Sequence, residues 1–228
     1  MAVALRSVGT ATGGSGPQTA GAPAGTTTDD ILIACVAVYG NSGATSSGGW
    51  DEVATVEVTA SAAYLTVFAF RHVGGSPDYE FDAGGQPILV QVMAFSGADT
   101  GFATYDQVAG QANASSTTVT APTITPSADG CMVALIAAAF NEPTVTVSGY
   151  SGTDPTFTEA LDSQYDGGAP ELTIAAATGV QATAAATGSR TATLTTACVN
   201  AGVLLSIAPP VAGGQPVRSM HQSRLRRQ

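Results

Sequence analysis

The sequence predicts an all-β fold: a jelly-roll-like sandwich of two sheets with an internal pseudo-repeat and an extended C-terminal arm. An apolar run opened by acid at residues 29–40 recurs at residues 129–140. Apolar segments of strand length follow each run, at 64–70 and 88–95 after the first and at 172–177 and 203–207 after the second. No segment sustains a 3.6-residue period between helix caps. Such recurrence indicates two similar β-rich halves.

In the first half, short runs rich in β-branched or aromatic residues and bounded by turn residues predict strands. Residues 9–28, rich in Gly, Ala, Thr and Pro, are expected to form a loop. Residues 78–82 alternate strictly between acids and aromatics, which predicts a half-buried strand. The strands expected in this half are 2–8, 31–38, 53–58, 64–71, 78–82 and 88–95.

The second half is expected to repeat this organisation. Its Ala-rich stretch at 174–187 could be helical by propensity, but its Thr, Val and Gly content favours a strand followed by a loop. The strands expected here are 117–124, 131–140, 145–147, 172–177, 191–195 and 203–207. Many short strands at regular spacing predict a sandwich or jelly roll.

We expect one domain over residues 1–208, a Pro/Gly linker over 209–216 and a basic arm over 217–228. The charge divides in the same way. Residues 1–217 hold three arginines and 17 acids, a net charge of −14, whereas 218–228 hold four arginines and no acid. The chain contains no lysine. An acidic body repels nucleic acid and anionic membranes, so we expect neither as a partner.

Neither targeting segments nor disulfides are predicted. The longest apolar run has ten residues, too few to span a bilayer. The three cysteines are odd in number and lack CxxC spacing, and Cys35 and Cys131 lie inside the two matching runs. We therefore expect Cys35, Cys131 and Cys198 to be buried free thiols in a protein that folds in a reducing compartment.

The sequence predicts no enzyme and no cofactor. Of the two histidines, His72 is expected on the surface with its hydrogen bonds satisfied, and His221 lies in the arm. There is no GxSxG nucleophile motif, no phosphate-binding glycine loop and no zinc-ligand spacing. Trp50, the only tryptophan, is expected to pack in the core or at an edge, with stacking on a sugar ring as the alternative.

The best metal candidate is the row Asp78, Glu80 and Asp82, whose period of two places three carboxylates on one strand face. Carboxylates two residues apart lie roughly 6.6 Å apart along a strand and tend to splay. An exposed acidic face is therefore the prediction, and a calcium site the alternative.

Several motifs in order resemble a family of β-rich proteins encoded in structural gene clusters of tailed phages. They are the acid-led strand at 29–39, Gly-Trp at 49–50, the aromatic strand at 64–71, Tyr-x-Phe at 79–81, Phe-Ser-Gly-Ala-Asp at 95–99, Thr-Val-Thr-Ala-Pro at 118–122 and Gly-x-Arg-Thr-Ala-Thr at 188–193. In the second half, Gly149–Tyr150 stands in place of Gly-Trp. The resemblance implies a virion component such as a capsid decoration protein, a minor tail protein or a surface module, with no catalytic motif to transfer.

From these features we expect a capsid decoration (cement) protein that is made in the host cytoplasm and incorporated into the virion. Its partners would be the major capsid protein or other virion subunits, and we expect a homo-oligomer. The alternative is a tail-associated or surface adhesin module that binds host-surface carbohydrate. The residues expected to contact a partner are Arg218, Met220, His221, Arg224, Leu225, Arg226 and Arg227.

Overall fold

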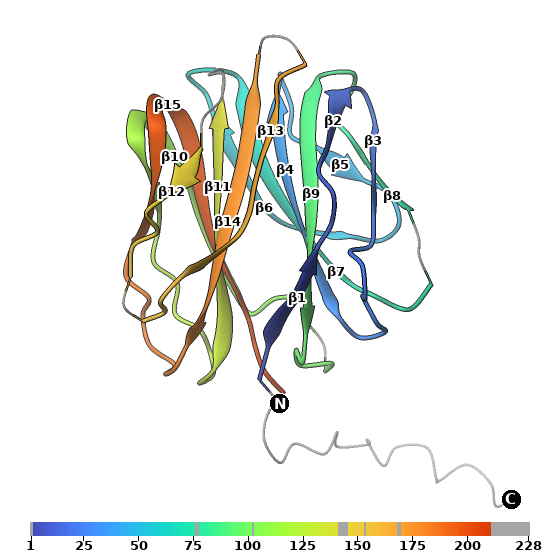
Figure 1. Ribbon diagram of the computed structural model, residues 1–228, viewed down its shortest axis with the longest axis vertical. Helices are drawn as coiled ribbons and strands as arrows, with labels where there is room; N and C mark the ends of the chain where they lie inside the picture. Colours follow the sequence, from blue (N-terminus) through green and yellow to red (C-terminus); the bar gives the residue numbers. More distant parts are fainter. Residues whose placement is uncertain are drawn as a thin grey trace, which may run out of the picture.

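The computed structural model describes residues 2–75, 78–101, 103–140, 146–152, 154–167 and 170–210. Within these ranges the chain forms β-strands and no helix. The strands form three antiparallel sheets, and the two large ones lie side by side (Figure 1). The predicted all-β, two-sheet architecture is confirmed.

The first large sheet comes from the N-terminal half of the chain. Its central strand β4 (Ile31–Tyr39) pairs with β7 (Ala63–Arg71) on one side and β9 (Pro87–Ser96) on the other. The remaining strands are β6 (Asp51–Val58) beside β7, and β1 (Ala4–Val8) and β2 (Thr12–Ser15) beside β9.

The second large sheet comes from the C-terminal half. Its central strand β11 (Cys131–Phe140) pairs with β14 (Leu172–Gln181) and β15 (Arg190–Ile207). The remaining strands are β13 (Thr158–Tyr165) beside β14, and β10 (Gln107–Ala121) and β12 (Val147–Ser148) beside β15. A third, small sheet contains β3 (Gln18–Gly21), β8 (Asp78–Asp82) and β5 (Thr45–Ser46).

The two large sheets have the same strand order. The first runs β1-β9-β4-β7-β6, and the second runs β10-β15-β11-β14-β13. Both edge strands carry a register shift at the matching place, after Glu52 in β6 and after Glu159 in β13. The internal pseudo-repeat is therefore confirmed. Each sheet comes from one half of the chain, and the jelly-roll detail stays a prediction.

The two halves also share a backbone hydrogen bond just before each central strand. Asp29, at φ 72°, donates its backbone N–H to the carbonyl of His72 at 2.8 Å. Gly130, at φ 76°, donates to the carbonyl of Gln181 at 2.9 Å. Both turns require the left-handed region that favours glycine, and Asp tolerates it better than most residues.

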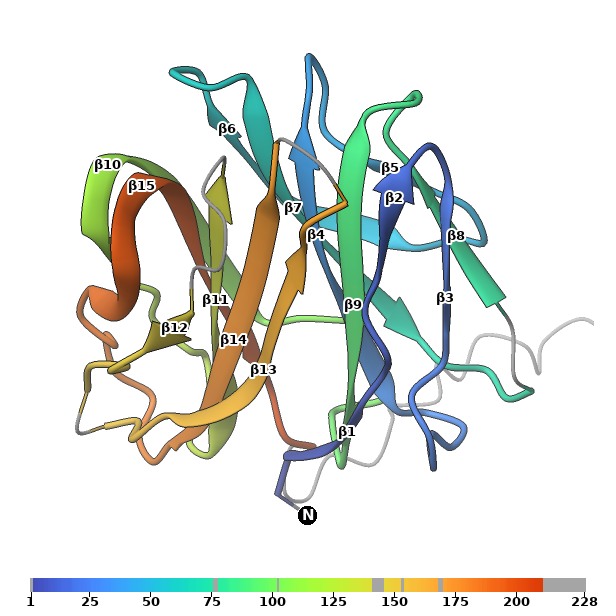
Figure 2. The same cartoon turned by 45° about the horizontal axis from the view of Figure 1, so that its top comes forward.

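The central strands are apolar throughout because both of their faces are buried. On β4, Ile31 and Ile33 face the core between the two large sheets, whereas Leu32 and Ala34 face the small sheet. β11 likewise divides its side chains between the shared core and an outer core over the second sheet. Figure 2 shows β3, β5 and β8 outside the first sheet. The outer core of the second sheet is covered by residues of β10, β12 and β15.

Several predictions about elements differ from the structure, and the short strand β5 was also not predicted. The expected loop at 9–28 contains β2 and β3, and the strand expected at 117–124 begins at Gln107 as β10. The two strands expected at 191–195 and 203–207 are one strand, β15, and β13 was not predicted. β10 and β13 expose many of their residues, so they lack the apolar runs on which the prediction depended. β15 ends at Ile207, and residues 211–228 lie outside the described residues.

Candidate functional surfaces

The acidic row on β8 lies on the outer face of the small sheet. Asp78 and Glu80 are exposed and Asp82 is partly buried, whereas Tyr79 and Phe81 point into the core, as the alternation predicted. Asp82 Oδ1 accepts a hydrogen bond from the Gly84 N–H at 2.9 Å. Within the described residues, no group of three or more Asp, Glu, His or Cys side chains is placed to hold a metal ion. The row is therefore an acidic face rather than a convergent ligand set.

The second half carries a neutral row in the corresponding place. In the second half, β12 pairs with β15, and Val147 lies opposite Leu194. In the first half, β5 pairs with β8 in a similar way, and Ser46 lies opposite Phe81. Along this part of β15, Ala192 and Leu194 are buried and Thr193 and Thr195 are exposed. The two outer faces thus differ in charge while sharing one backbone arrangement.

Trp50 lies in a cluster of aromatic rings in the outer core of the first half. Trp50 is 8% exposed and packs against Phe70, Tyr79 and Phe81 with ring centroids 5.0–5.3 Å apart, which confirms the core prediction for Trp50. Offset and edge-to-face contacts of this kind favour rigid packing. Since these rings face inward, they do not offer a surface on which a sugar could stack.

Gly149 and Tyr150 occupy a similar place in the second half. Gly149 has φ 61°, and Tyr150 packs against the outer core there, as Trp50 packs in the outer core of the first half. The Trp50 indole N–H and the Tyr150 hydroxyl are both buried without a hydrogen-bond partner. The substitution of Tyr for Trp in the motif therefore preserves its packing role.

His72 is not on the surface as predicted. It is 1% exposed, its Nδ1 lies 3.3 Å from the Tyr79 hydroxyl, and its backbone N–H donates to the carbonyl of Asp30 at 2.9 Å. It follows directly after β7, and its side chain meets β8 in the outer core. No pattern in the sequence indicates this burial, because the neighbouring Val73, Gly74 and Gly75 are typical of an exposed turn.

The cysteine prediction is confirmed. Cys35, Cys131 and Cys198 are buried, and none of the three forms a disulfide. Burial raises the pKa of the Cys35 thiol to about 12. Burial also raises the pKa of the Cys131 thiol to about 11, and the nearby carboxylates of Asp106 and Asp129 add to that effect.

A second-half carboxylate is held in an incompletely satisfied environment. Asp162 on β13 accepts a hydrogen bond from the Val147 N–H of β12 at 3.1 Å, while its other oxygen is buried and has no hydrogen-bond partner among the described residues. Burial raises the pKa of Asp162, the Val147 hydrogen bond opposes this, and Glu159 raises it further. Burial, together with Glu159 and Asp162, also raises the pKa of Tyr150.

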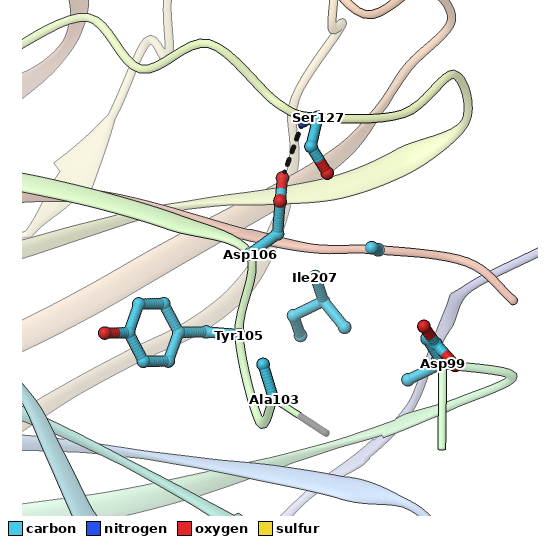
Figure 3. A pocket seen from close by; sticks show the side chains of 8 residues that line it. Asp99, Ala103, Tyr105, Asp106, Ser127 and Ile207 are labelled. Carbon is cyan, nitrogen blue, oxygen red and sulfur yellow. Dashed lines mark hydrogen bonds between the residues drawn. The ribbon is translucent and has the colours of Figure 1, made fainter. Parts of the chain in front are cut away.

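A hollow of about 210 Å³ lies where the two halves join (Figure 3). The link between β9 and β10 supplies five of the lining residues, and Ile207, the last residue of β15, and Ala208 after it supply two more. Asp99 and Asp106 lie on opposite sides of Ile207 in the view of Figure 3. The full lining is Ala98, Asp99, Ala103, Tyr105, Asp106, Ser127, Ile207 and Ala208.

Hydrogen bonds hold the walls of the hollow in place. Asp106 Oδ2 accepts from the Ser127 N–H and from the Ser206 hydroxyl, both at 2.9 Å. Asp99 is held by its backbone: its carbonyl accepts a hydrogen bond from Arg71 Nη2 at 3.0 Å, and its N–H donates to the Ala208 carbonyl at 2.9 Å. No sequence pattern predicts this hollow, because its residues come from three separated segments.

The predicted partner contacts Arg218, Met220, His221, Arg224, Leu225, Arg226 and Arg227 all lie outside the described residues. In the part of the chain that is described, no helix has the length and apolar character needed to cross a membrane. Comparison with protein families, with curated proteins and with solved structures found no match.

Proposed function

We propose that this protein is a non-enzymatic structural component of a tailed-phage virion, a capsid decoration protein that attaches by its arginine-rich C-terminal segment. The observation that carries the proposal is the division of charge along the chain. Residues 1–217 have a net charge of −14, and the four arginines of 218–228 follow a stretch rich in Pro and Gly. The resemblance of the ordered motifs to phage structural proteins supports the same assignment.

The packing of the body supports a scaffold role. Both faces of β4 and of β11 are covered by other parts of the same chain, so the apolar surface is used internally. The outer faces present carboxylates on β8 and hydroxyls on β15. A rigid, hydrophilic body of this kind is suited to display on a particle, with attachment left to the terminal segment.

The free energy that each arginine can contribute to attachment is small. Arginine pairs bidentately with carboxylates, yet an exposed ion pair contributes only about 0–1 kcal/mol. Met220 and Leu225 would supply apolar contacts beside the arginines, and many copies on one lattice would add avidity. We therefore propose a homo-oligomer on the major capsid protein, with binding that weakens as salt rises.

The test is co-sedimentation with particles assembled from the major capsid protein. Replacing Arg224, Arg226 and Arg227 with Ser is expected to lower occupancy at low ionic strength. The matched control replaces Asp78, Glu80 and Asp82 with Asn, Gln and Asn. It removes the same number of charged groups as the arginine variant, but from the acidic body rather than from the C-terminal segment. Occupancy of the triple arginine variant equal to that of wild type at every salt concentration contradicts the proposal.

A further inference from the structure

The hollow at the junction of the halves has the chemistry of a cation receptor. Its lining includes the apolar side chains of Ile207 and Ala208, and Asp99 and Asp106 lie on opposite sides of Ile207 in Figure 3. Asp99 Oδ1 accepts the Gly101 N–H at 2.9 Å, and Asp106 accepts its bonds through Oδ2. Among the described residues, none is hydrogen-bonded to Asp99 Oδ2 or to Asp106 Oδ1. Each carboxylate therefore keeps one oxygen for a ligand.

The charges around the hollow leave a net negative site. Arg71 does not line the hollow but lies next to it, where its Nη2 donates to the carbonyls of Asp99 and Ala103 at 3.0 and 3.4 Å. These bonds direct the guanidinium to the backbone rather than to either carboxylate. Two carboxylates against one such guanidinium attract a further positive group.

The volume limits what can enter. About 210 Å³ corresponds to roughly seven water volumes at about 30 Å³ each. Small-molecule sites usually enclose about 300–1,000 Å³. The hollow is therefore suited to a single side chain. Arginine matches its lining, because the apolar stem can pack on Ile207 while the planar guanidinium pairs with the carboxylates of Asp99 and Asp106.

We propose that this hollow receives the Arg218 side chain of the same chain. The chain leaves the body at the hollow itself, since the Ala208 carbonyl accepts the Asp99 N–H. Arg218 follows Ala208 by ten residues, with Gly213 and Gly214 between them to allow reversal. Ten residues span up to about 35 Å when extended, which is enough to leave the body and return.

The tether decides between this chain and a second copy as the source of the arginine. A short flexible link gives an effective concentration on the order of mM, far above the micromolar concentration of other copies in solution. Arg218 also has a shorter tether than the later arginines, and loop closure costs less for shorter loops. The inference concerns the free protein and is independent of whether residues 224–227 bind a shell.

The experiment is amide NMR on the full-length protein at low salt. Replacing Arg218 with Gln is expected to shift the amide signals of Asp99, Ala103, Tyr105 and Ala208. Arg227→Gln makes the same charge change and is expected to leave these signals in place. Raising the salt from about 20 mM to about 0.5 M should reduce the effect of Arg218→Gln at least twofold, because screening shortens the range of the attraction.

A change in the hollow supplies the reciprocal measurement. In Asp99→Asn, the amide oxygen can still accept the Gly101 N–H while the charge is removed, and the Arg218 signals should move toward random-coil positions. If Asp99→Asn fails to fold, the Arg218→Gln comparison decides alone, since Arg218 lies beyond the strands of the body.

Three results would overturn the inference. One is hollow signals that do not respond to Arg218→Gln, and another is an equal response to Arg227→Gln, which would indicate diffuse attraction. The third is shifts that grow over a tenfold rise in protein concentration, which would identify a second copy as the source. If replacing residues 224–227 abolishes binding to the capsid shell, that result supports the proposed function whichever of these three outcomes occurs.

Discussion

The thiols of Cys35 and Cys131 have pKa values raised by burial to about 12 and about 11. Since the thiolate is the nucleophile, neither thiol is expected to react in the folded protein at pH 8. Titration with a chromogenic disulfide should detect no cysteine in the native state and all three after unfolding in guanidinium. A cysteine that reacts within minutes in the native protein would contradict the buried free-thiol assignment.

Asp162 gives a prediction about pH. Its pKa is raised in the folded state, with burial as the main cause, so folding favours the protonated carboxyl. The stability that this group contributes is therefore fully present below its unfolded pKa and is lost as the pH rises through its folded pKa. Asp162→Asn removes the charge and keeps an acceptor for the Val147 N–H. We expect it to stabilise the protein at pH 7 by up to about 1 kcal/mol.

The measurement is urea unfolding of Asp162→Asn and wild type at pH 7 and at pH 3.5. The gain should shrink at the lower pH, where the wild-type carboxyl is protonated. Asp166→Asn, directly after the same strand, is the control, because Asp166 is exposed and such changes stay within about 0.5 kcal/mol. A loss of stability at pH 7 in Asp162→Asn would show that the carboxylate itself supports the β12 contact.

At the scale of elements, the path of β10 over β15 requires a close backbone approach. Gly202 of β15 lies under β10, and a Cβ there would sit 2.6 Å from the Thr120 carbonyl oxygen. A backbone carbonyl cannot move aside as the end of a flexible side chain can. Gly202→Ala is therefore expected to lower the free energy of unfolding by about 1–3 kcal/mol. Gly21→Ala, where the nearest atom is an Asp78 carboxylate oxygen at 3.6 Å, is the matched control. Equal midpoints of denaturation for the two variants would contradict this packing.

The elements differ in how far the sequence could predict them. β4 and β11 were predicted because both of their faces are buried, which makes them continuous apolar runs. β8 was predicted by its strict alternation. β13 was missed because it carries the polar residues Glu159, Asp162 and Gln164, which are typical of a loop. β2 and β3 are rich in Gly and Thr and gain their structure from pairing with β9 and β8, a tertiary effect.

The candidate sites show the same limit. Neighbouring residues in one strand, such as Asp78, Glu80 and Asp82, could be placed on one face from their spacing alone. The hollow could not be predicted, since Asp99, Ser127 and Ile207 meet only when the link between the halves packs against the end of β15. His72 was misplaced for a similar reason, because its burial depends on Tyr79 in a different sheet.

At the scale of the whole molecule, the two halves share one central core. Ile33 from the first half and Ile136 from the second are both fully buried in it, and β11 contacts both β4 and β7. Neither inner face is covered without the other half, so the halves should unfold together as one cooperative unit. Truncating either isoleucine to Ala should destabilise the protein by about 2–5 kcal/mol.

The only tryptophan makes this coupling measurable, because Trp50 lies in the outer core of the first half. Ile136→Ala alters the second half alone, yet it should lower the midpoint of the Trp50 fluorescence transition by roughly 4–20 °C, on the scale of about 2–4 °C per kcal/mol for a chain of this size. Ile33→Ala in the first half should lower the same midpoint to a similar extent. Independent halves would instead leave the Trp50 transition of Ile136→Ala at the wild-type temperature, with a separate earlier transition in circular dichroism.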